Sequence, residues 1–373
     1  MTRKRILFLI NSLEGGGAER VMSTLLRHSA SERERYDIVL GLLDDLPAAY
    51  AVPDWVEVRQ LNGKQSFLRS VMAVRDLVAD VRPHVTLSFL TRSNVANVLS
   101  GRMPCVISER ANTSGHFSAG PRGMLSRAVV RALYPRAARV IAVSEGVADD
   151  LRDNFGVPAD RLIAIPNPVD MDAICAKAAE PPSVAIEGPY ILAAGRLVTS
   201  KNFSMLICAF AATESDRTLV IAGEGPEREA LARLASEHGA GKRILLPGFV
   251  GNPYPLMRGA ELFVLSSNVE GFPNALVEAM ALGTPVIATN CASGPSEILA
   301  DASRAEIAGL TMAPYGVLVD AGSTEQMAEA LERMRDGELR RTYGAKAAER
   351  ARVYSPESVK DRYWSVLREV LSE

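Results

Sequence analysis

The stretch Leu262-Phe-Val-Leu-Ser-Ser-Asn-Val-Glu-Gly-Phe-Pro-Asn-Ala-Leu-Val-Glu-Ala-Met-Ala-Leu-Gly-Thr-Pro-Val-Ile-Ala-Thr289 contains one complete strand–helix–strand unit. Two short apolar runs, 262–266 and 285–289, have the length and composition of buried strands. The residues between them, 274–282, are predicted to form a helix, because Pro273 suits the first turn of a helix. A unit of this kind predicts an α/β protein whose parallel sheet is covered by helices on both faces.

The same alternation of apolar runs and amphipathic segments continues through the whole chain. It is interrupted by a linker-like segment rich in alanine and proline, 178–189, and then starts again. Strands are predicted at Arg5–Ile10, Tyr36–Leu43, Trp55–Leu61, His84–Leu90, Cys105–Glu109, Arg139–Ser144, Leu162–Pro166, Tyr190–Ala194, Thr218–Ala222, Arg243–Pro247 and Gly316–Val319. Helices are predicted at Ala18–Arg27, Phe67–Val81, Leu125–Tyr134, Glu145–Asn154, Asn202–Ala212, Glu227–Ser236, Ser323–Arg335, Glu338–Val353 and Pro356–Leu371. The restart predicts two doubly wound α/β domains with a boundary near residue 183.

The composition is that of a globular protein. Of the 373 residues 47% are hydrophobic and 23% are charged, and the net charge is −2, which argues against disorder. Four cysteines do not form a disulfide framework, which favours a reducing compartment. The apolar run Ile6–Ile10 is too short for a secretory signal, and no run reaches the roughly 20 residues of a membrane span. The protein is therefore predicted to be cytoplasmic, with membrane contact that is at most peripheral.

Ligands of open α/β sheets bind beyond the carboxyl ends of the strands, so the loops that follow strands are the candidate sites. After the first strand, Gly15-Gly-Gly17 opens a helix. Its backbone either lets an anionic ligand approach closely or forms only a flexible turn. After the strand at 190–194, Arg196 and Lys201 place two cations before a helix, which suits a diphosphate. Both loops therefore favour an anionic ligand.

The loop inside the opening stretch carries two glutamates. With a helix that starts near Phe272, Glu270 lies in the loop and Glu278 lies on the second turn, in an otherwise apolar segment. A carboxylate in such surroundings needs hydrogen-bond donors, because an unpaired buried charge is costly. The first helical residues are expected to direct free N–H groups at a ligand, namely those of Asn274, Ala275 and Leu276.

These motifs resemble those of the retaining glycosyltransferases of family 4, which have the GT-B fold. The two glutamates match the E-x7-E motif of that family, and Gly195-Arg-Leu with Lys201-Asn matches its preceding basic loop. Further matching segments follow in the same order along nearly the whole chain: Gly15–Gly17, Pro166–Asp170, Gly223–Pro226, Pro247–Phe249 and Gly283–Ile287. Within the family, the sequences around Gly16 and Glu270 look most like those of bacterial enzymes that build lipid-linked oligosaccharides or exopolysaccharides.

The resemblance implies two doubly wound Rossmann-like domains that face one another across a cleft. The first, residues 1–183, would be the acceptor side. The second, residues 184–355, would hold a nucleotide diphospho-sugar. The last helix, at about 356–373, would pack back on the first domain.

The resemblance also implies a donor site. Arg196 and Lys201 would hold the diphosphate and neutralise the charge that grows on the leaving group. Glu278 would accept hydrogen bonds from the ribose hydroxyls, and Glu270 would contact the donor sugar near the reacting carbon. The other donor contacts would come from Gly16, Gly17, Glu224, Phe249, Gly271, Phe272, Asn274, Ala275 and Leu276. The donor is expected to be UDP- or GDP-linked, with no cofactor and no metal, because the fixed cations take the role of a metal ion. Asp170-Met-Asp172 spells a D-x-D motif, but it lies away from any donor loop.

A loop of the first domain offers further candidates. The segment Ser108-Glu-Arg-Ala-Asn112 departs from the forms that are commoner in the family, and His116 follows it. His116 either lies near the donor sugar, where its ring could also serve acid–base chemistry, or is a surface residue. Glu109 and Asn112 are candidates for contacts to the acceptor or the sugar. No nucleophile is assigned: the family expectation is front-face departure, in which the leaving phosphate takes the proton of the acceptor.

The net charge of −2 conceals an uneven distribution. Residues 59–139 contain 13 Lys/Arg against three Asp/Glu, whereas residues 181–373 contain 19 against 24. Arg122, Arg127 and Arg131 follow Pro121 in a segment with apolar neighbours. A helix there either rests on anionic lipid or packs on the sheet with solvated arginines. Nucleic acid is a third interpretation, but few aromatic residues are interleaved with the basic ones, so no nucleic-acid partner is expected.

The resemblance, taken with these features, implies a metal-independent glycosyltransferase, a hexosyltransferase at the inner face of a bacterial membrane. It would move a sugar from a nucleotide diphosphate to a lipid-linked or polysaccharide acceptor. Two alternatives stay open: a nucleotide-sugar epimerase with the GT-B fold, and a non-catalytic nucleotide-sugar-binding protein. The epimerase would need an acid–base set around the C2 proton of the sugar. Hydrolysis of the donor without acceptor would separate an enzyme from a binding protein.

Overall fold

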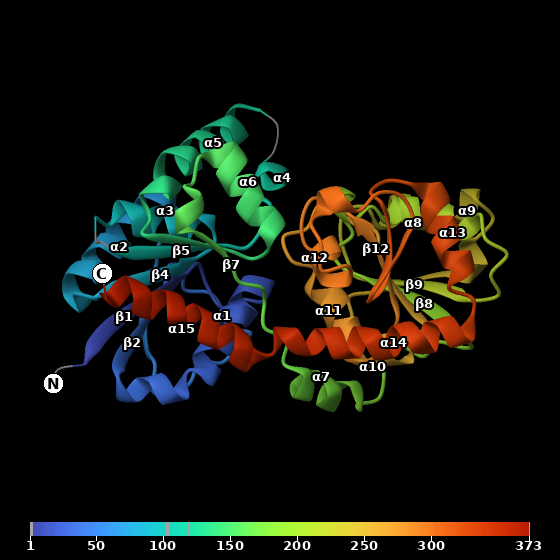
Figure 1. Cartoon of the computed structure of the whole chain (residues 1–373), viewed down its shortest axis with the longest axis horizontal. Coiled ribbons are helices and arrows are strands. Elements are labelled where there is room, and N and C mark those ends of the chain that lie inside the picture. The colour runs from blue at the N-terminus through green and yellow to red at the C-terminus, as the bar shows by residue number, and fades with distance from the viewer. Residues whose placement is uncertain (1–2, 102–103, 118–119, 373) are drawn as a thin grey trace. The chain divides into compact units, whose positions relative to one another are not determined.

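The computed structural model describes residues 3–101, 104–117 and 120–372. Contacts divide the chain into two units: residues 1–168 with 356–373, and residues 169–355. Each unit is built around a seven-stranded sheet flanked by helices (Figure 1). The predicted doubly wound α/β architecture is therefore confirmed for both halves.

The sheet of the first unit is entirely parallel, in the order β3-β2-β1-β4-β5-β6-β7. Its strand order reverses between β1 and β4, which makes the carboxyl ends of these two strands a switch point. The strands are β1 (Lys4–Ile10), β2 (Tyr36–Leu42), β3 (Glu57–Gln60), β4 (Val85–Phe89), β5 (Cys105–Glu109), β6 (Arg139–Ala142) and β7 (Leu162–Ala164). The helices are α1 (Gly17–His28), α2 (Phe67–Val81), α3 (Thr91–Leu99), α4 (Thr113–His116), α5 (Pro121–Leu133), α6 (Glu145–Phe155) and α15 (Pro356–Ser372).

Both faces of this sheet are buried, which explains its continuous apolar strands. Along β1, Phe8 and its even-numbered neighbours pack with α1 and α15, whereas Leu7 and Leu9 pack with α2. Helix α15 is fixed by Trp364, whose ring stacks on Tyr36 at 5.2 Å and whose Nε1–H donates to Ser29 Oγ at 2.7 Å. The last helix is thus part of the core of the first unit.

The sheet of the second unit repeats the same order, β10-β9-β8-β11-β12-β14-β13, with only β13 antiparallel. Its switch point lies between β8 and β11. The strands are β8 (Tyr190–Ala194), β9 (Thr218–Ala222), β10 (Ile244–Gly248), β11 (Leu262–Leu265), β12 (Val286–Asn290), β13 (Thr311–Ala313) and β14 (Gly316–Asp320). The helices are α7 (Met171–Ala178), α8 (Phe203–Ala211), α9 (Arg228–Glu237), α10 (Tyr254–Gly259), α11 (Asn274–Ala281), α12 (Pro295–Leu299), α13 (Thr324–Arg333) and α14 (Gly337–Ala351).

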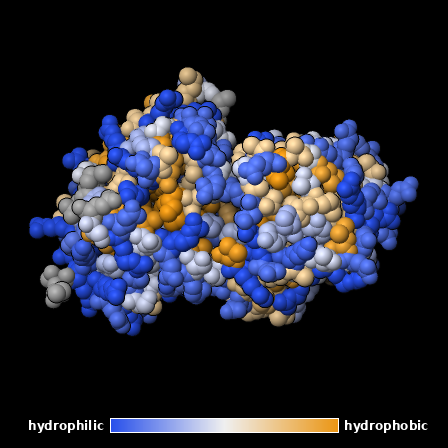
Figure 2. All heavy atoms as spheres, in the orientation of Figure 1, coloured by the Kyte–Doolittle hydropathy of each residue, from blue (hydrophilic) through white to orange (hydrophobic). Residues whose placement is uncertain are grey.

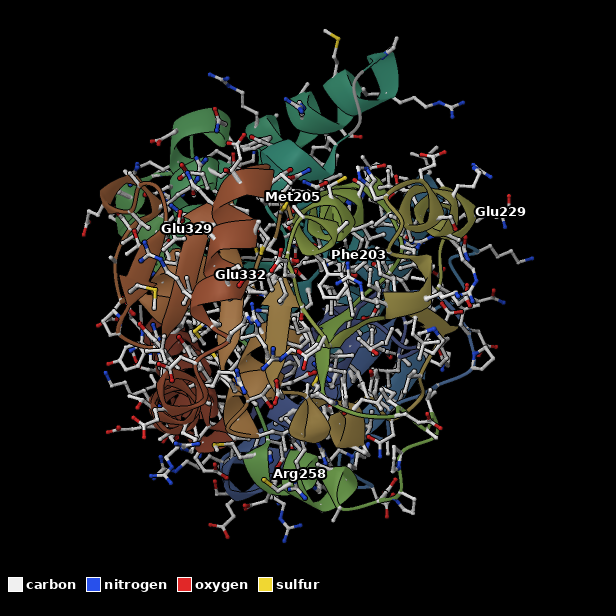
Figure 3. The ribbon with its side chains drawn as sticks, turned by 90° about the vertical axis from the view of Figure 1, so that its right-hand side faces the viewer. Phe203, Met205, Glu229, Arg258, Glu329 and Glu332 are labelled. Carbon is white, nitrogen blue, oxygen red and sulfur yellow. The ribbon has the colours of Figure 1, made fainter. Side chains whose placement is uncertain are left out.

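Two groups of helices cover the second sheet (Figure 1). Helices α8, α9 and α13 share one core with the strands; Figure 3 labels Phe203 and Met205 on α8, Glu229 on α9 and Glu332 on α13. Helix α11 packs against α10 and α14. Helix α11 is therefore braced along its length, which matters for the loop that precedes it.

The sequence predicts a boundary between the units near residue 183. In the structure the division falls earlier, after Pro168. The reason is α7, which packs on α10 and α11. The side chain of Arg258 donates to the carbonyl of Cys175 at 3.2 Å, and Asn252 donates to the carbonyl of Lys177 at 2.9 Å (Figure 3). Residues 169–183 thus belong with the second sheet.

Several short elements were not predicted: α3, α4, α7, α10, α12 and β13. Helix α3 was not predicted because its buried residues mix polar and apolar side chains, with Ser93, Asn94 and Asn97 beside Val95, Ala96 and Val98. Asn94 Nδ2 donates to the carbonyl of Ser108 at 2.9 Å, and Asn97 accepts from Thr86 Oγ1 at 2.6 Å. Helix α5 begins at Pro121, four residues before the predicted start at Leu125. None of the described helices combines the length and the apolar composition needed to cross a membrane.

Candidate functional site

The basic loop of the second unit, with Arg196 and Lys201, follows strand β8. The acidic loop, with Glu270, follows the adjacent strand β11. Because both strands are parallel and meet at the switch point, their loops emerge at the same edge of the sheet. The loops are also joined directly: Asn268 N–H donates to the carbonyl of Ser200 at 2.8 Å, and Asn202 Nδ2 donates to Asn268 Oδ1 at 3.0 Å. The sheet topology therefore unites two motifs that are far apart in the sequence.

Lys201 and Glu270 form the centre of this edge. Lys201 Nζ lies 2.5 Å from Glu270 Oε1, which also accepts from Ser267 Oγ at 2.6 Å. The backbone of both residues is held as well, since Ser266 Oγ donates to the carbonyl of Lys201 and Ser293 Oγ to that of Glu270. The side chains are 26% and 10% exposed, so both are partly accessible to a ligand.

Arg196 and Glu278 complete the predicted polar set, in contrasting surroundings. Arg196 is exposed, and within the described part of the chain no ion pair engages it. Glu278 is only 6% exposed, on the second turn of α11. The structure thus brings Lys201 and Glu270 into contact, while Arg196 and Glu278 stand on the same two loop–helix segments.

The start of α11 corrects one sequence prediction. Pro273 is the N-cap residue and provides no side-chain cap. The N–H of Leu276 donates to the carbonyl of Pro273 at 3.0 Å, so this group is not free, contrary to prediction. Asn274 and Ala275 occupy the first two helical positions, where backbone N–H groups have no intrahelical acceptor.

The loops after β8, β9 and β10 interlock through glycines. Gly223 has φ +152°, and a Cβ there would lie 1.8 Å from the carbonyl oxygen of Gly195. Leu197 N–H donates to the carbonyl of Glu224 at 2.9 Å, which joins the same two loops. The side chain of Glu224 pairs with Arg228 at 3.0 Å, and Phe249, just beyond β10, is 79% exposed. Glu224 and Phe249 thus stand on neighbouring loops at the carboxyl edge.

In the first unit, the glycine loop leads directly into α1. Gly16 is the N-cap residue and Gly17 the first helical residue, and both are exposed. A Cβ on Gly16 would lie 2.1 Å from Glu19 Oε2, because that carboxylate folds back over the helix start.

The switch point of the first sheet contains an ion pair that the sequence analysis missed. Arg92, just after β4, binds both carboxylate oxygens of Asp44, just after β2. Burial alone would raise the pKa of Asp44, but the hydrogen bonds from Arg92 and from the N–H of Gln65 hold that pKa below its usual value. Arg92 directly follows the predicted strand His84–Leu90, and this position could have marked it as a candidate site residue.

Glu109, the buried last residue of β5, anchors the loop that follows this strand. This carboxylate is 3% exposed and accepts from Tyr134 Oη at 2.5 Å, Thr91 Oγ1 at 3.3 Å and the N–H of Arg110 at 3.0 Å. Burial raises the pKa of Glu109 despite these donors. Glu109 therefore fixes the loop from inside the unit.

Asn112 and His116 mark the two ends of α4. Asn112 Oδ1 accepts from the N–H of Gly115 at 2.8 Å and so caps the helix, whereas the ring of His116 is exposed. Close by, Arg127 of α5 donates to the carbonyls of Ser114 and Phe117, at 2.8 and 3.3 Å. Arg122 and Arg131 of the same helix are exposed.

Asp170 of the D-x-D sequence caps α7, because its Oδ1 accepts from the N–H of Ala173 at 3.0 Å. Over the described ranges, no group of three or more His, Cys, Asp or Glu side chains is arranged to hold a metal ion.

Comparison with known families matches both units. Residues 15–173 match the model "Glycosyltransferase Family 4", and residues 177–350 match "Glycosyl transferases group 1". The two matches together span most of the chain and meet close to the division between the units.

Relatives match over nearly the full length. An N-acetylgalactosamine-N,N'-diacetylbacillosaminyl-diphospho-undecaprenol 4-alpha-N-acetylgalactosaminyltransferase from Campylobacter jejuni is 29% identical, over 94% of this chain and 96% of the relative. The amylovoran biosynthesis glycosyltransferase AmsD of Erwinia amylovora is 24% identical, over 97% and 99%.

Solved structures share the fold. The Anabaena protein Alr3699/HepE, crystallised with UDP, superimposes with a TM-score of 0.77 at 21% identity, over 98% of this chain and 100% of that one. A sucrose-phosphate synthase from Thermosynechococcus elongatus gives 0.79 at 18% identity, over 99% and 100%. With both units matched by glycosyltransferase models, the chain is a glycosyltransferase, similar to those of family 4 and with the GT-B fold.

Proposed function

We propose that the second unit binds a nucleotide diphospho-sugar and that the enzyme transfers the sugar with retention of its anomeric configuration. The observation that carries this proposal is the contact between Lys201 and Glu270 at the switch point of the second sheet. An ammonium group has three N–H donors. One can serve Glu270 while the others face the diphosphate, so the ion pair orients Lys201 before the donor arrives.

In this proposal, positive charge supplies the main catalytic effect. The bond between the anomeric carbon and the diphosphate breaks, and negative charge grows on the leaving oxygen. Lys201 and the exposed Arg196 stabilise that negative charge. Their interaction with the leaving oxygen is stronger in the transition state than in the bound donor, because the charge grows as the bond breaks. Glu270 holds the sugar, the leaving phosphate takes the proton of the acceptor hydroxyl, and the new bond forms on the face that the phosphate leaves.

We propose UDP or GDP as the nucleotide and a lipid-linked or polysaccharide acceptor. A UDP complex is known for the Anabaena neighbour, the Campylobacter relative is named for a diphospho-undecaprenol acceptor, and the Erwinia relative for amylovoran biosynthesis. These names support a bacterial glycan pathway for this chain too.

A panel of nucleotides tests the donor proposal. At 100 times its Kd, the cognate nucleoside diphosphate is expected to raise Tm by about 5 °C or more, since it binds only the folded state. Other nucleotides serve as controls and should leave Tm unchanged. With the cognate sugar donor, proton NMR of the first-formed product should show the donor's anomeric configuration. An inverted centre would exclude the retaining mechanism, and no shift with any nucleotide would exclude the donor site.

We further propose that the first unit rests on an anionic membrane surface through helix α5 and the start of α2. On α5, Met124 and Leu125 are 70% and 67% exposed, beside the exposed Arg122. On α2, Leu68 and Met72 are 72% and 59% exposed. Helix α2 follows β3, and α5 follows β5 after the short helix α4, so each comes after the carboxyl end of a strand. At the end of the unit that carries α5, Figure 2 shows hydrophobic and hydrophilic residues side by side.

Charge reversal tests the membrane proposal. Wild-type protein should co-sediment with vesicles rich in anionic lipid, and the double variant Arg122→Glu/Arg131→Glu should bind about 30-fold more weakly, at roughly 1 kcal/mol for each basic residue. Arg127 is left unchanged because it holds the carbonyls of Ser114 and Phe117. The control Arg233→Glu/Arg341→Glu makes the same charge change on exposed helices of the second unit. Equal binding of both double variants would reject this surface.

A further inference from the structure

Phe272 lies in the donor loop, between Glu270 and the start of α11. It is 8% exposed, and its ring meets the ring of Tyr354 edge to face, with centroids 5.3 Å apart and planes at 69°. Tyr354 is itself fixed, because its carbonyl accepts from the N–H of Val169 at 2.7 Å. Burial raises the pKa of Tyr354 to about 12, so its hydroxyl stays neutral at physiological pH. Phe272 thus rests on an immobile, uncharged ring.

Arg350 joins Tyr354 to the opposite side of the same loop. Its guanidinium lies over the ring of Tyr354, at 5.8 Å, and donates to the carbonyls of Glu297 and Ile298 in α12, at 2.8 and 3.1 Å. Helix α12 follows Gly294, where a Cβ would lie only 2.6 Å from Cδ of Pro273. The side chain of Arg350 is 13% exposed. One largely shielded guanidinium therefore connects the elements that touch Phe272 and Pro273.

Helix α14, which carries Arg350, also supports the far end of α11. A Cβ on Gly344 would lie 2.3 Å from the carbonyl oxygen of Gly283, just after α11. Such a close backbone approach leaves little freedom for sliding between the two helices. Helix α14 thus forms a rigid support for α11. Arg350 and Tyr354 lie near the start of α11, where the donor loop joins the helix.

We infer that Arg350 and Tyr354 are positioning residues of the donor site: through Phe272 and α12 they hold Glu270 and the start of α11 in the geometry that binds the nucleotide sugar. This inference rests on the proposed donor site. Neither residue touches the donor, and each acts through the loop. Displacements of about 1 Å at a site of this kind reduce turnover markedly.

Three variants separate positioning from simple stability. Tyr354→Leu removes the ring that Phe272 contacts, Arg350→Met removes the guanidinium, and Tyr354→Phe keeps the ring. The matched control is Arg243→Met, because Arg243 also lies over an aromatic ring, that of Phe210 at 5.0 Å, and donates to a backbone carbonyl in the same unit. All measurements are made at a temperature at which circular dichroism shows every variant folded.

Hydrogen exchange of residues 270–276 should become faster in Tyr354→Leu and Arg350→Met, but not in Tyr354→Phe or Arg243→Met. The Kd for UDP or GDP should rise about tenfold in the first two variants, and their kcat/KM for the donor should fall by a similar factor. Unchanged exchange and affinity in Tyr354→Leu would overturn the inference, as would an equal loss in Arg243→Met. Faster exchange in a protein whose wild type binds neither nucleotide would overturn the proposed function and leave the bracing of the loop established.

Discussion

Lys201→Ala is expected to lower kcat/KM by about 1,000-fold, because a preorganised charge at a developing anion contributes on that scale. The variant removes the ammonium that lies 2.5 Å from Glu270 Oε1, and with it the cation assigned to the leaving diphosphate. Glu270 keeps the hydrogen bonds that it accepts from Ser267 Oγ and, at its carbonyl, from Ser293 Oγ, so the loop stays anchored. Initial rates with the cognate donor measure the loss, and the Tm of the unliganded protein should change little.

Two further variants control for this result. Lys242→Ala removes an exposed lysine of the same unit, just before β10, and should leave the rate unchanged. Lys201→Arg keeps the charge but replaces a compact ammonium by a planar group, so it should recover only part of the activity. Full activity in Lys201→Ala would place the donor elsewhere.

The strands and helices of this chain were predictable where burial dominates the sequence. Cys105–Glu109, Tyr190–Ala194 and Thr218–Ala222 have the predicted bounds, because strands covered on both faces are mostly apolar. Helix α2 has them too. Helix α3 was missed because two of its buried residues, Asn94 and Asn97, are asparagines that bond to neighbouring strands, and these interrupt the apolar period.

The donor residues were predictable from loops, but their contacts were not. The pairing of Lys201 with Glu270 follows from the adjacency of β8 and β11, which only the strand order reveals. No local sequence pattern predicts which residues support Phe272. Tyr354 belongs to a short turn after α14, and Arg350 resembles any surface arginine of an amphipathic helix. A single sequence names the residues that carry charge more readily than those that position them.

Glu278→Ala is expected to raise the KM for the donor about 100-fold, with a smaller change in kcat. A carboxylate that accepts from two ribose hydroxyls makes two charge-assisted hydrogen bonds, and the loss of such bonds costs about 3 kcal/mol in total. The ribose is bound equally in the ground state and the transition state, so the loss appears mainly in KM. Glu278→Gln keeps one acceptor oxygen and should lie between the wild type and the alanine variant.

A thermodynamic cycle with the ribose distinguishes this role from a structural one. Wild-type enzyme should bind the 2′-deoxy form of its nucleoside diphosphate at least tenfold more weakly than the ribose form, since one hydrogen bond to the charged carboxylate is lost. Glu278→Ala should bind both forms with equal affinity, because the acceptor is gone in either case. Glu278 is 6% exposed among apolar neighbours of α11, so its removal also alters packing. Packing changes affect both nucleotides alike and cancel in the cycle. Undiminished discrimination in Glu278→Ala would therefore show that another group holds the ribose, whatever the variant does to stability.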